Sequence, residues 1–250
     1  MDDTRTLAER TIALLYGALC HLSFACGVAL MVWGLHEGLR GSWGGLEGPQ
    51  AWLVNALLVL QFPLLHTWLL SKQGEPVLTR FAPGRLGRDL CTTTFATFAA
   101  LQLVLVFALW SPSGVVWWEA TGPLRWGLQV AYALSWVAVV KTMGDAGLET
   151  QLGFLGWASV ARGRSPRHAG FPQEGSFSLC RQPIYAAFAL TLWTGPVWTP
   201  DRLALALTWT AYCVFGPLAK EARYRERYGQ AYVAYQARTP YLIPWPRARA

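Results

Sequence analysis

The sequence predicts an all-α membrane protein with about six transmembrane helices, and its composition, its apolar segments and the placement of its cations support this prediction. The chain of 250 residues is 53% hydrophobic and only 14% charged, with 14 tryptophans. Soluble domains carry about 25% charged residues, so this composition favours residence in a membrane. Several apolar segments approach the length of about 20 residues that an α-helix needs to cross a bilayer.

The apolar segments predict the membrane helices in order along the chain. The predicted spans are residues 12–35, 51–70, 90–110, 124–140, 184–197 and 203–218. No cleavage pattern of small residues follows the first span, which is also longer than the apolar core of a signal peptide, so we expect it to be retained. The last two spans are short, and the Gly and Pro residues between them stop helices. They therefore predict a tight helical hairpin.

The cations of the loops alternate between the two sides of the membrane. Of the 21 Lys and Arg residues, only three lie in the loops after the first, third and fifth spans, namely Arg40, Arg125 and Arg202. Cytoplasmic loops carry the excess of Lys and Arg. The pattern predicts a multi-pass protein of a bacterial-type inner (plasma) membrane with both termini in the cytoplasm. Because the cations follow loop order rather than one face, the net charge of +7 does not indicate nucleic-acid binding.

The chain is predicted to be one continuous membrane domain with two parts. Residues 1–174 form a transmembrane scaffold of spans one to four, ending in a basic connector, 162–174, that is either a lid or a surface loop. Residues 175–250 hold the hairpin and a polar C-terminal helix, at about 219–236, on the cytoplasmic face. The five cysteines form no CxxC pair and predict buried thiols rather than a disulfide framework or a metal site: Cys20, Cys26, Cys91, Cys180 and Cys213.

Polar and mostly cationic side chains lie at both ends of the hairpin. Arg181, Gln182 and Tyr185 open the fifth span, and Glu221 and Arg223 follow the sixth. Because the two spans are antiparallel, we expect these side chains to meet just under the lipid headgroups. Arg181 or Gln182 suits a carboxylate, whereas Glu221 suits an ammonium or ribose hydroxyls. The competing interpretation is simple positive-inside flanking with snorkelling arginines.

Ordered motifs surround the same hairpin, at residues 175–185, 220–221, 228–235 and 240–244. In this order they resemble the Gly-x-Tyr-(x)3-Arg-His-Pro-x-Tyr, Glu-Glu, Phe-Gly-x-x-Tyr-x-x-Tyr and Val-Pro-x-x-x-Pro motifs of the isoprenylcysteine carboxyl methyltransferase-like membrane methyltransferases. Looser similarity to the methanethiol S-methyltransferase branch extends upstream, at residues 65–66, 80–83 and 114–117.

The resemblance implies S-adenosylmethionine bound on the cytoplasmic side, with an acceptor entering from the membrane. It implies these cofactor-binding residues: Gly175, Gln182, Tyr185, Glu221 and Tyr235. Arg181 and Arg223 are the expected catalytic cations, since positive charge favours a thiolate. The expected acceptor is a small, methanethiol-like thiol methylated at sulfur. A carboxylate on a lipidated cysteine or another amphiphile is the alternative, membrane lipid is a further partner, and the oligomeric state stays open.

Two residues depart from the motifs. The family His is Gln182 here, which cannot titrate, and the first family Glu is Lys220, which reverses a charge at the mouth of the cofactor site. These departures support an alternative of another class, a repurposed non-catalytic or haem-binding membrane protein. His21 and His66 lie inside predicted spans and are the candidate haem ligands.

Hydrogen bonding between helices is the preferred explanation of the polar residues within the predicted spans. It applies to His21 and His66 as well as to Asn55 and Gln61. Asp145 and Glu149 lie one helical turn apart after the fourth span. We expect both carboxylates to be solvated, the alternative being that they face the cofactor pocket.

Overall fold

The computed structural model describes residues 5–244. Both chain ends, including Arg247 and Arg249, lie outside the described residues. The predicted cytoplasmic location of the termini therefore stays a prediction. Most of the described chain is α-helical, as predicted. The helices that are long and apolar enough to cross a membrane are α1 (Leu7–His36), α2 (Gly48–Leu69), α5 (Cys91–Leu109) and α10 (Pro200–Tyr228). The prediction of a largely α-helical membrane protein is therefore confirmed in outline.

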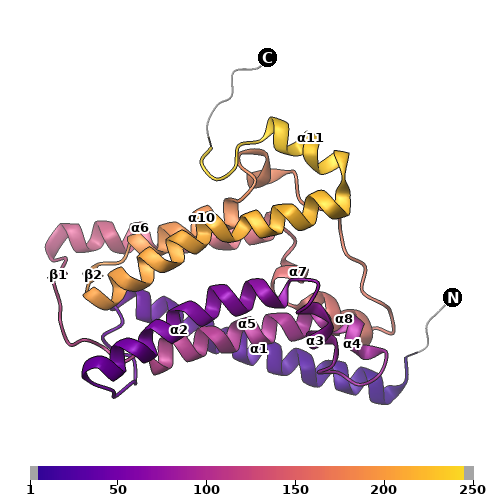
Figure 1. Cartoon of the computed structure of the whole chain (residues 1–250), viewed down its shortest axis with the longest axis horizontal. Helices are drawn as coiled ribbons and strands as arrows, with labels where there is room; N and C mark the ends of the chain where they lie inside the picture. The colour runs from indigo at the N-terminus through magenta and orange to yellow at the C-terminus, as the bar shows by residue number, and fades with distance from the viewer. Residues whose placement is uncertain (1–4, 245–250) are drawn as a thin grey trace. The chain divides into compact units, whose positions relative to one another are not determined.

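The chain divides into two compact units. The first comprises residues 5–34, 42–111 and 147–170, and the second comprises residues 35–41, 112–146 and 171–244 (Figure 1). The sequence predicts a different kind of division, at residue 174, between a scaffold and a cofactor-binding part. That division stays a prediction.

The first unit is built from α1, α2, α5 and four short helices: α3 (Glu75–Thr79), α4 (Leu86–Asp89), α7 (Leu148–Gln151) and α8 (Phe154–Ala161). The packing partners of α5 include α2 and α8. Gln102 Nε2 on α5 donates to Gln61 Oε1 on α2 at 2.8 Å. Asn55 binds the backbone of Ser111 through both ends of its amide, at 2.8 and 2.9 Å. The predicted bonding between helices is thus confirmed for Gln61, whereas Asn55 bonds to a residue just beyond the end of α5.

The two histidines of the predicted spans also lie in the first unit. Trp157 Nε1 on α8 donates to His21 Nε2 at 3.0 Å, which confirms bonding between helices for His21. His66 packs against the rings of Phe62 and Phe95, with centroids 5.0 and 4.8 Å away. Because the acceptor nitrogen of His21 is already used by an indole, these contacts favour a packing role over haem ligation.

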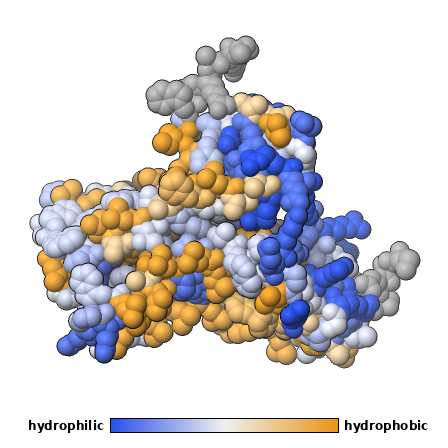
Figure 2. Space-filling view, viewed as in Figure 1, coloured by the Kyte–Doolittle hydropathy of each residue, from blue (hydrophilic) through white to orange (hydrophobic). Residues whose placement is uncertain are grey.

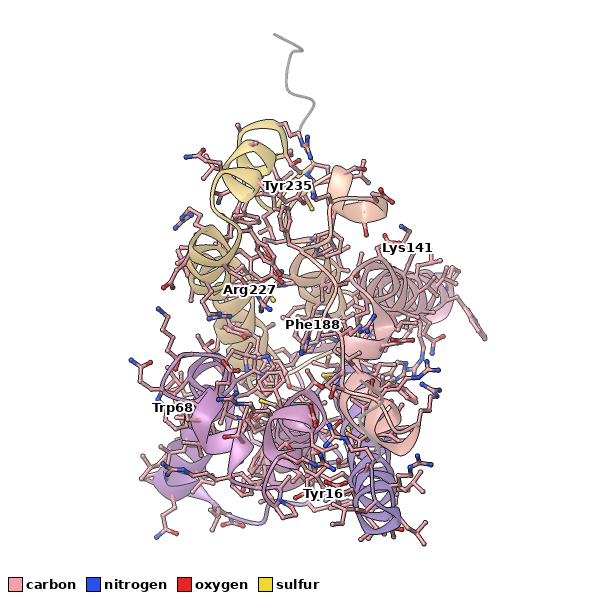
Figure 3. All side chains as sticks on the ribbon, turned by 90° about the vertical axis from the view of Figure 1, so that its right-hand side faces the viewer. Tyr16, Trp68, Lys141, Phe188, Arg227 and Tyr235 are labelled. Carbon is pink, nitrogen blue, oxygen red and sulfur yellow. The ribbon has the colours of Figure 1, made fainter. Side chains whose placement is uncertain are left out.

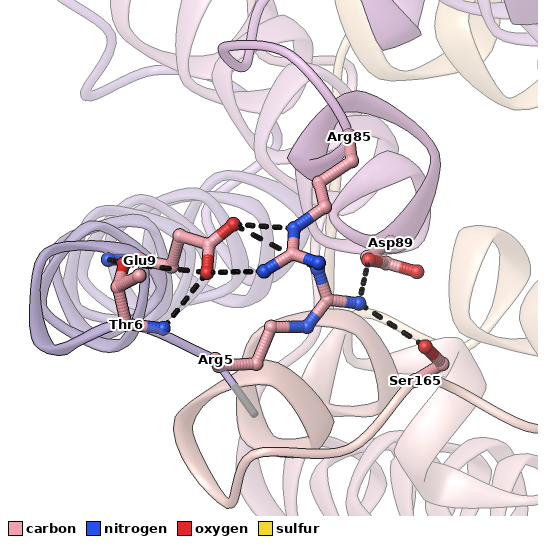
Figure 4. A network of polar contacts seen from close by, with 6 residues as sticks. All are labelled: Arg5, Thr6, Glu9, Arg85, Asp89 and Ser165. Carbon is pink, nitrogen blue, oxygen red and sulfur yellow. Dashed lines mark hydrogen bonds and ion pairs between the residues drawn. The ribbon is translucent and has the colours of Figure 1, made fainter. Parts of the chain in front are cut away.

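Ion pairs fix the N-terminal end of α1 (Figure 4). Arg5 Nη2 donates to Asp89 at 2.6 Å and to Ser165 at 3.1 Å. The guanidinium of Arg85 donates to both carboxylate oxygens of Glu9, at 2.7 and 2.8 Å. Several of the cations that mark this predicted cytoplasmic side therefore also tie the chain segments of the first unit to one another.

The second unit contains α6 (Gly122–Asp145), the 3-10 helix η1 (Gly175–Ser178), α9 (Pro183–Trp193), α10 and α11 (Gln230–Arg238). The short helix α9 packs against both α6 and α10. α6, α9 and α10 each have a proline in their first turn, where a missing N–H is harmless. Two short strands, β1 (Trp118–Glu119) and β2 (Val197–Trp198), pair antiparallel and are the exception to the all-α prediction.

The predicted fifth span, 184–197, is wrong at its C-terminal end. α9 stops at Trp193, and its 11 residues measure only about 16 Å, half of a hydrocarbon core of about 30 Å. The chain then extends to pair with β1. Arg202 accounts for this ending, because its guanidinium donates to the carbonyl of Leu192 at 3.0 Å and to that of Val197 at 2.8 Å. Arg202 is fully buried and is not the loop cation that the sequence predicts.

The predicted C-terminal helix at 219–236 is also wrong in its bounds. α10 continues without a break past the predicted end of span six and reaches Tyr228. Gly229, with φ of 53°, then reverses the chain into α11. Glycine adopts this left-handed conformation without the steric cost of a side chain. Figure 2 shows hydrophilic residues gathered over the end of α10 and over α11.

All five cysteines are free thiols. Cys20, Cys180 and Cys213 are buried, as predicted, and Cys91 is partly buried. Cys26 is exposed on α1, so the prediction of a buried thiol is wrong at this position.

Candidate functional site

The polar cluster of the second unit is centred on Glu221, which is only 3% exposed. Its Oε1 accepts from Arg181 Nε at 2.8 Å and from Gln182 Nε2 at 2.9 Å. Its Oε2 accepts from Gln236 Nε2 at 2.6 Å and from Arg181 Nη2 at 3.2 Å. Three residues that the sequence predicts to meet at the hairpin therefore touch one another directly.

Arg181 connects the start of α9 to the C-terminal tail. Besides Glu221, its guanidinium binds the backbone carbonyls of Gln236 at 3.1 Å and Thr239 at 2.6 Å. Its backbone N–H donates to the carbonyl of Pro240 at 2.9 Å. A charge removed from water needs such partners. The ion pair of Arg181 and Glu221 therefore links the start of α9 to α10 and to the C-terminal tail.

The two residues that depart from the family motifs face each other. Lys220 Nζ donates to Gln182 Oε1 at 3.1 Å, while the amide nitrogen of Gln182 donates to Glu221. A glutamine amide carries both an acceptor and a donor, so one side chain links an ammonium to a carboxylate. The departures at positions 182 and 220 thus form one hydrogen-bonded unit.

Aromatic rings surround the ammonium of Lys220. The ring centroids of Tyr224, Tyr185 and Phe177 lie 5.6, 5.7 and 5.9 Å from its Nζ. Ring faces attract cations at such distances. Arg223, on the same helix, is half-buried and has no hydrogen-bond or ion-pair partner among residues 5–244. It differs in this from Arg181, the other predicted catalytic cation.

Asp145, at the end of α6, fixes the start of η1. Its carboxylate accepts from the backbone N–H of Ser176 at 2.7 Å, and it also binds the Ser176 hydroxyl and Lys141. The hydrogen bonds from Lys141 and Ser176 lower the pKa of Asp145 to about 2. The expectation of solvated carboxylates holds for Glu149, which is exposed, and in part for Asp145, whose side chain is 23% exposed but is also bound by Ser176.

Gly175 is required by this contact. Its φ is +58°, and a Cβ at this position would lie 2.6 Å from the carboxyl carbon of Asp145. We therefore expect Gly175→Ala to destabilise the protein by at least about 1–2 kcal/mol, the cost of a left-handed backbone for an L-residue. Thermal unfolding in detergent measures the change. Gly127→Ala is the matched control, since its Cβ would enter open space on α6; equal stability of the two variants would contradict the prediction.

Tyr235 on α11, labelled in Figure 3, is buried. Its hydroxyl donates to the carbonyl of Phe177 at 2.6 Å. Burial raises the pKa of Tyr235 to about 12. The ring of Phe171, from the connector, packs against Tyr235, Tyr228 and Tyr232, with centroids 4.9 to 5.6 Å apart. Tyr235 therefore supports η1 and anchors the end of the connector.

Sequence reasoning misses two contributors to the site, Tyr224 and Gln236, and the partner of a third, Asp145. Gln236 lies on the polar helix that the sequence predicts, but its spacing carries no motif that pairs it with Glu221. Tyr224 follows Lys220 by one helical turn, and this spacing places both on one helix face. That periodicity was the available signal. For Asp145, a solvated and a pocket-facing position are both compatible with the sequence, and no local signal points to Ser176, which lies 31 residues away.

No family model matches the chain, and no solved structure matches it. Curated relatives match most of the chain. It is 28% identical over 240 residues to methanethiol S-methyltransferase of a Pseudomonas strain, covering 92% of this chain and 89% of that protein. Identity to the protein of that name from Mycobacterium tuberculosis is 26% over 246 residues, 95% of this chain and 98% of the relative. Methanethiol S-methyltransferase 2 of Bradyrhizobium diazoefficiens is 29% identical over 198 residues, 78% of this chain and 74% of the relative. The predicted resemblance to the methanethiol S-methyltransferase branch is therefore confirmed.

Proposed function

We propose that this protein is an integral membrane methyltransferase that moves the methyl group of S-adenosylmethionine to the sulfur of a small thiol such as methanethiol. The proposal rests on the similarity to methanethiol S-methyltransferases, which in the Pseudomonas relative extends over 92% of the present chain. The polar cluster at the end of an apolar hairpin supports it, because such a site can meet a soluble cofactor and a membrane-permeant acceptor.

The proposed topology has six crossings of the inner membrane. The long apolar helices supply four, α6 a fifth, and α9 with the extended residues after it the remaining one. The alternation of loop cations supports cytoplasmic termini and a cytoplasmic α11. In this topology the cluster around Glu221 lies on the cytoplasmic side, where S-adenosylmethionine is present in solution.

The side chains of the cluster suit the cofactor. The rings of Phe177, Tyr185 and Tyr224 offer faces for a sulfonium, and the unpaired guanidinium of Arg223 suits a carboxylate. When bound, S-adenosylmethionine supplies the methyl group and leaves as a neutral thioether.

The remaining residues position these groups. The Arg181–Glu221 pair, bridged by Gln182, holds α9 against α10 and the tail, so that the rings and Arg223 stay aligned. Gly175 and Tyr235 hold η1 in place. Since methyl transfer needs alignment and the exclusion of water more than acid–base chemistry, a rigid, half-buried frame serves it.

Purified protein in detergent, given methanethiol and S-adenosylmethionine, should form dimethyl sulfide with saturable kinetics, which gas chromatography of the headspace detects. Arg223→Gln should lower kcat/KM by about tenfold, the effect of losing roughly 1.4 kcal/mol of stabilisation. Arg227→Gln, an exposed cation on the same helix, is the matched control and should leave the rate unchanged.

Competing acceptors and a spectrum separate the alternatives. Methylation of a prenylated cysteine carboxylate in preference to free thiols would contradict the proposed acceptor. Failure to bind S-adenosylmethionine at millimolar concentration, measured by calorimetry, would overturn the methyltransferase proposal itself. A haem absorbance band in the purified protein would support the other class of function.

A further inference from the structure

Lys220 has bonding capacity that the fold does not use. Of the three N–H donors on its ammonium, one binds Gln182 Oε1 at 3.1 Å, and the other two have no hydrogen-bond partner among residues 5–244. The ammonium is partly withdrawn from water and lies among the rings of Phe177, Tyr185 and Tyr224. Open donors in an aromatic-lined site indicate a place for a ligand that is anionic or that becomes so.

The charged neighbours of Lys220 do not neutralise it directly. The charged and titratable groups around it are Arg181, Tyr185, Glu221, Arg223 and Tyr224. Glu221 accepts four hydrogen bonds from other side chains, two of them from the guanidinium of Arg181. Arg223 adds a second cation nearby. These neighbours act in opposite directions: the Glu221 carboxylate favours the ammonium, whereas burial and Arg223 favour the neutral amine, and burial is the largest of the three effects.

We propose that Lys220 activates the acceptor: its neutral amine takes the proton of the thiol and then holds the thiolate. The inference rests on the proposed function and deepens it. The S–H bond breaks with its electron pair left on sulfur, and the proton forms the third N–H bond of the Lys220 ammonium. After methyl transfer the ammonium returns this proton to water.

The other hydrogen-bonding and charged side chains of the cluster do not take this proton. Gln182 does not titrate, and arginine stays protonated in proteins, which excludes Arg181 and Arg223. Glu221 is committed to its ring of donors. While it is neutral, before the acceptor is deprotonated, Lys220 does not repel a bound sulfonium. Once Lys220 has taken the proton, the thiolate that it holds balances its charge.

The acidity of the acceptor provides the first test. Lys220→Met should lower kcat/KM at least 100-fold for an alkyl thiol, and by no more than about threefold for an aryl thiol that is already ionised at the assay pH. Lys220→Arg should remain as slow as Lys220→Met on the alkyl thiol. Lys72→Met, one of the two other lysines of the chain, is the control and should match the unchanged protein on both acceptors.

A second measurement needs no cofactor. Ethanethiol added to the unloaded protein should give the ultraviolet difference band of a thiolate, and Lys220→Met should abolish this band while Lys72→Met keeps it. The same band in Lys220→Met would overturn the inference. So would equal loss on both acceptors, which indicates a structural role, or recovery of the alkyl-thiol rate in Lys220→Arg, which indicates that charge alone suffices.

The two proposals fail separately. Absence of methyl transfer from every thiol contradicts the proposed function, and the thiolate band still tests Lys220 in that case. Methyl transfer by the unchanged protein together with a fully active Lys220→Met contradicts only the role of Lys220.

Discussion

Replacing Glu221 with alanine is expected to lower the free energy of unfolding by about 3–5 kcal/mol, because removal of one partner leaves a buried charge without compensation. Arg181 would keep its carbonyl partners but lose both of its carboxylate contacts. Gln182 and Gln236 would each lose an acceptor as well. Thermal unfolding in detergent, followed by circular dichroism, measures the change.

A control variant and a double-mutant cycle identify the cause of this loss. The control is Glu226→Ala, which removes an exposed carboxylate from the same helix and should change stability by less than about 0.5 kcal/mol. Combining Glu221→Leu with Arg181→Met removes both charges, and it should be less harmful than the sum of the single changes. Strict additivity would show that the two side chains do not act as a pair.

Replacing Arg202 with methionine is expected to destabilise the protein by about 1–3 kcal/mol for each carbonyl that loses its donor. The guanidinium satisfies the carbonyls of Leu192 and Val197 and lies 4.6 Å from the ring centre of Trp198. Methionine retains most of the volume but offers no donor, and because position 202 is fully buried within the protein, water does not replace the lost contacts. A lower unfolding temperature in detergent is the expected observation.

Arg125 supplies the comparison for this experiment. It belongs to the same set of three predicted outer cations, but it is 36% exposed and paired with Glu119. Arg125→Met should therefore change stability by only about 0–1 kcal/mol, the usual range for a surface pair. If Arg202→Met were as mild as Arg125→Met, the capping of α9 by Arg202 would be wrong.

The helices and the meeting of the hairpin ends could be predicted from the sequence because both depend on local properties. Apolar length marks a helix that can cross a membrane, and the antiparallel hairpin fixes which ends are neighbours. Arg181, Gln182 and Glu221 meet for that reason. Their roles in binding and catalysis stay predictions.

The features that sequence reasoning missed depend on partners far away in the chain. α9 ends early because Arg202 donates to the carbonyl of Leu192, in the last turn of the helix. The residues that follow the helix then pair with β1. Asp145 binds Ser176 across 31 positions. Neither contact has a periodic signal, so hydropathy alone extends α9 too far and does not reveal that Asp145 binds Ser176.

Comparison with a motif treats Gln182 and Lys220 as two separate departures, each of which weakens the inference of activity. The hydrogen bond between them changes this interpretation. A variant that restores only one of the family residues would leave an unmatched partner, so the two positions are best altered together.

The length of α10 connects the protein to the thickness of its bilayer. Arg202 and Glu221 lie 19 residues apart on this one helix, a rise of about 28 Å, close to the hydrocarbon thickness of about 30 Å. Each is fixed in a polar cluster that cannot slide into lipid without losing its partners. In membranes of markedly different thickness, one cluster would be drawn toward the acyl chains. Lipid composition is thereby a physical variable that acts on the geometry of the candidate site.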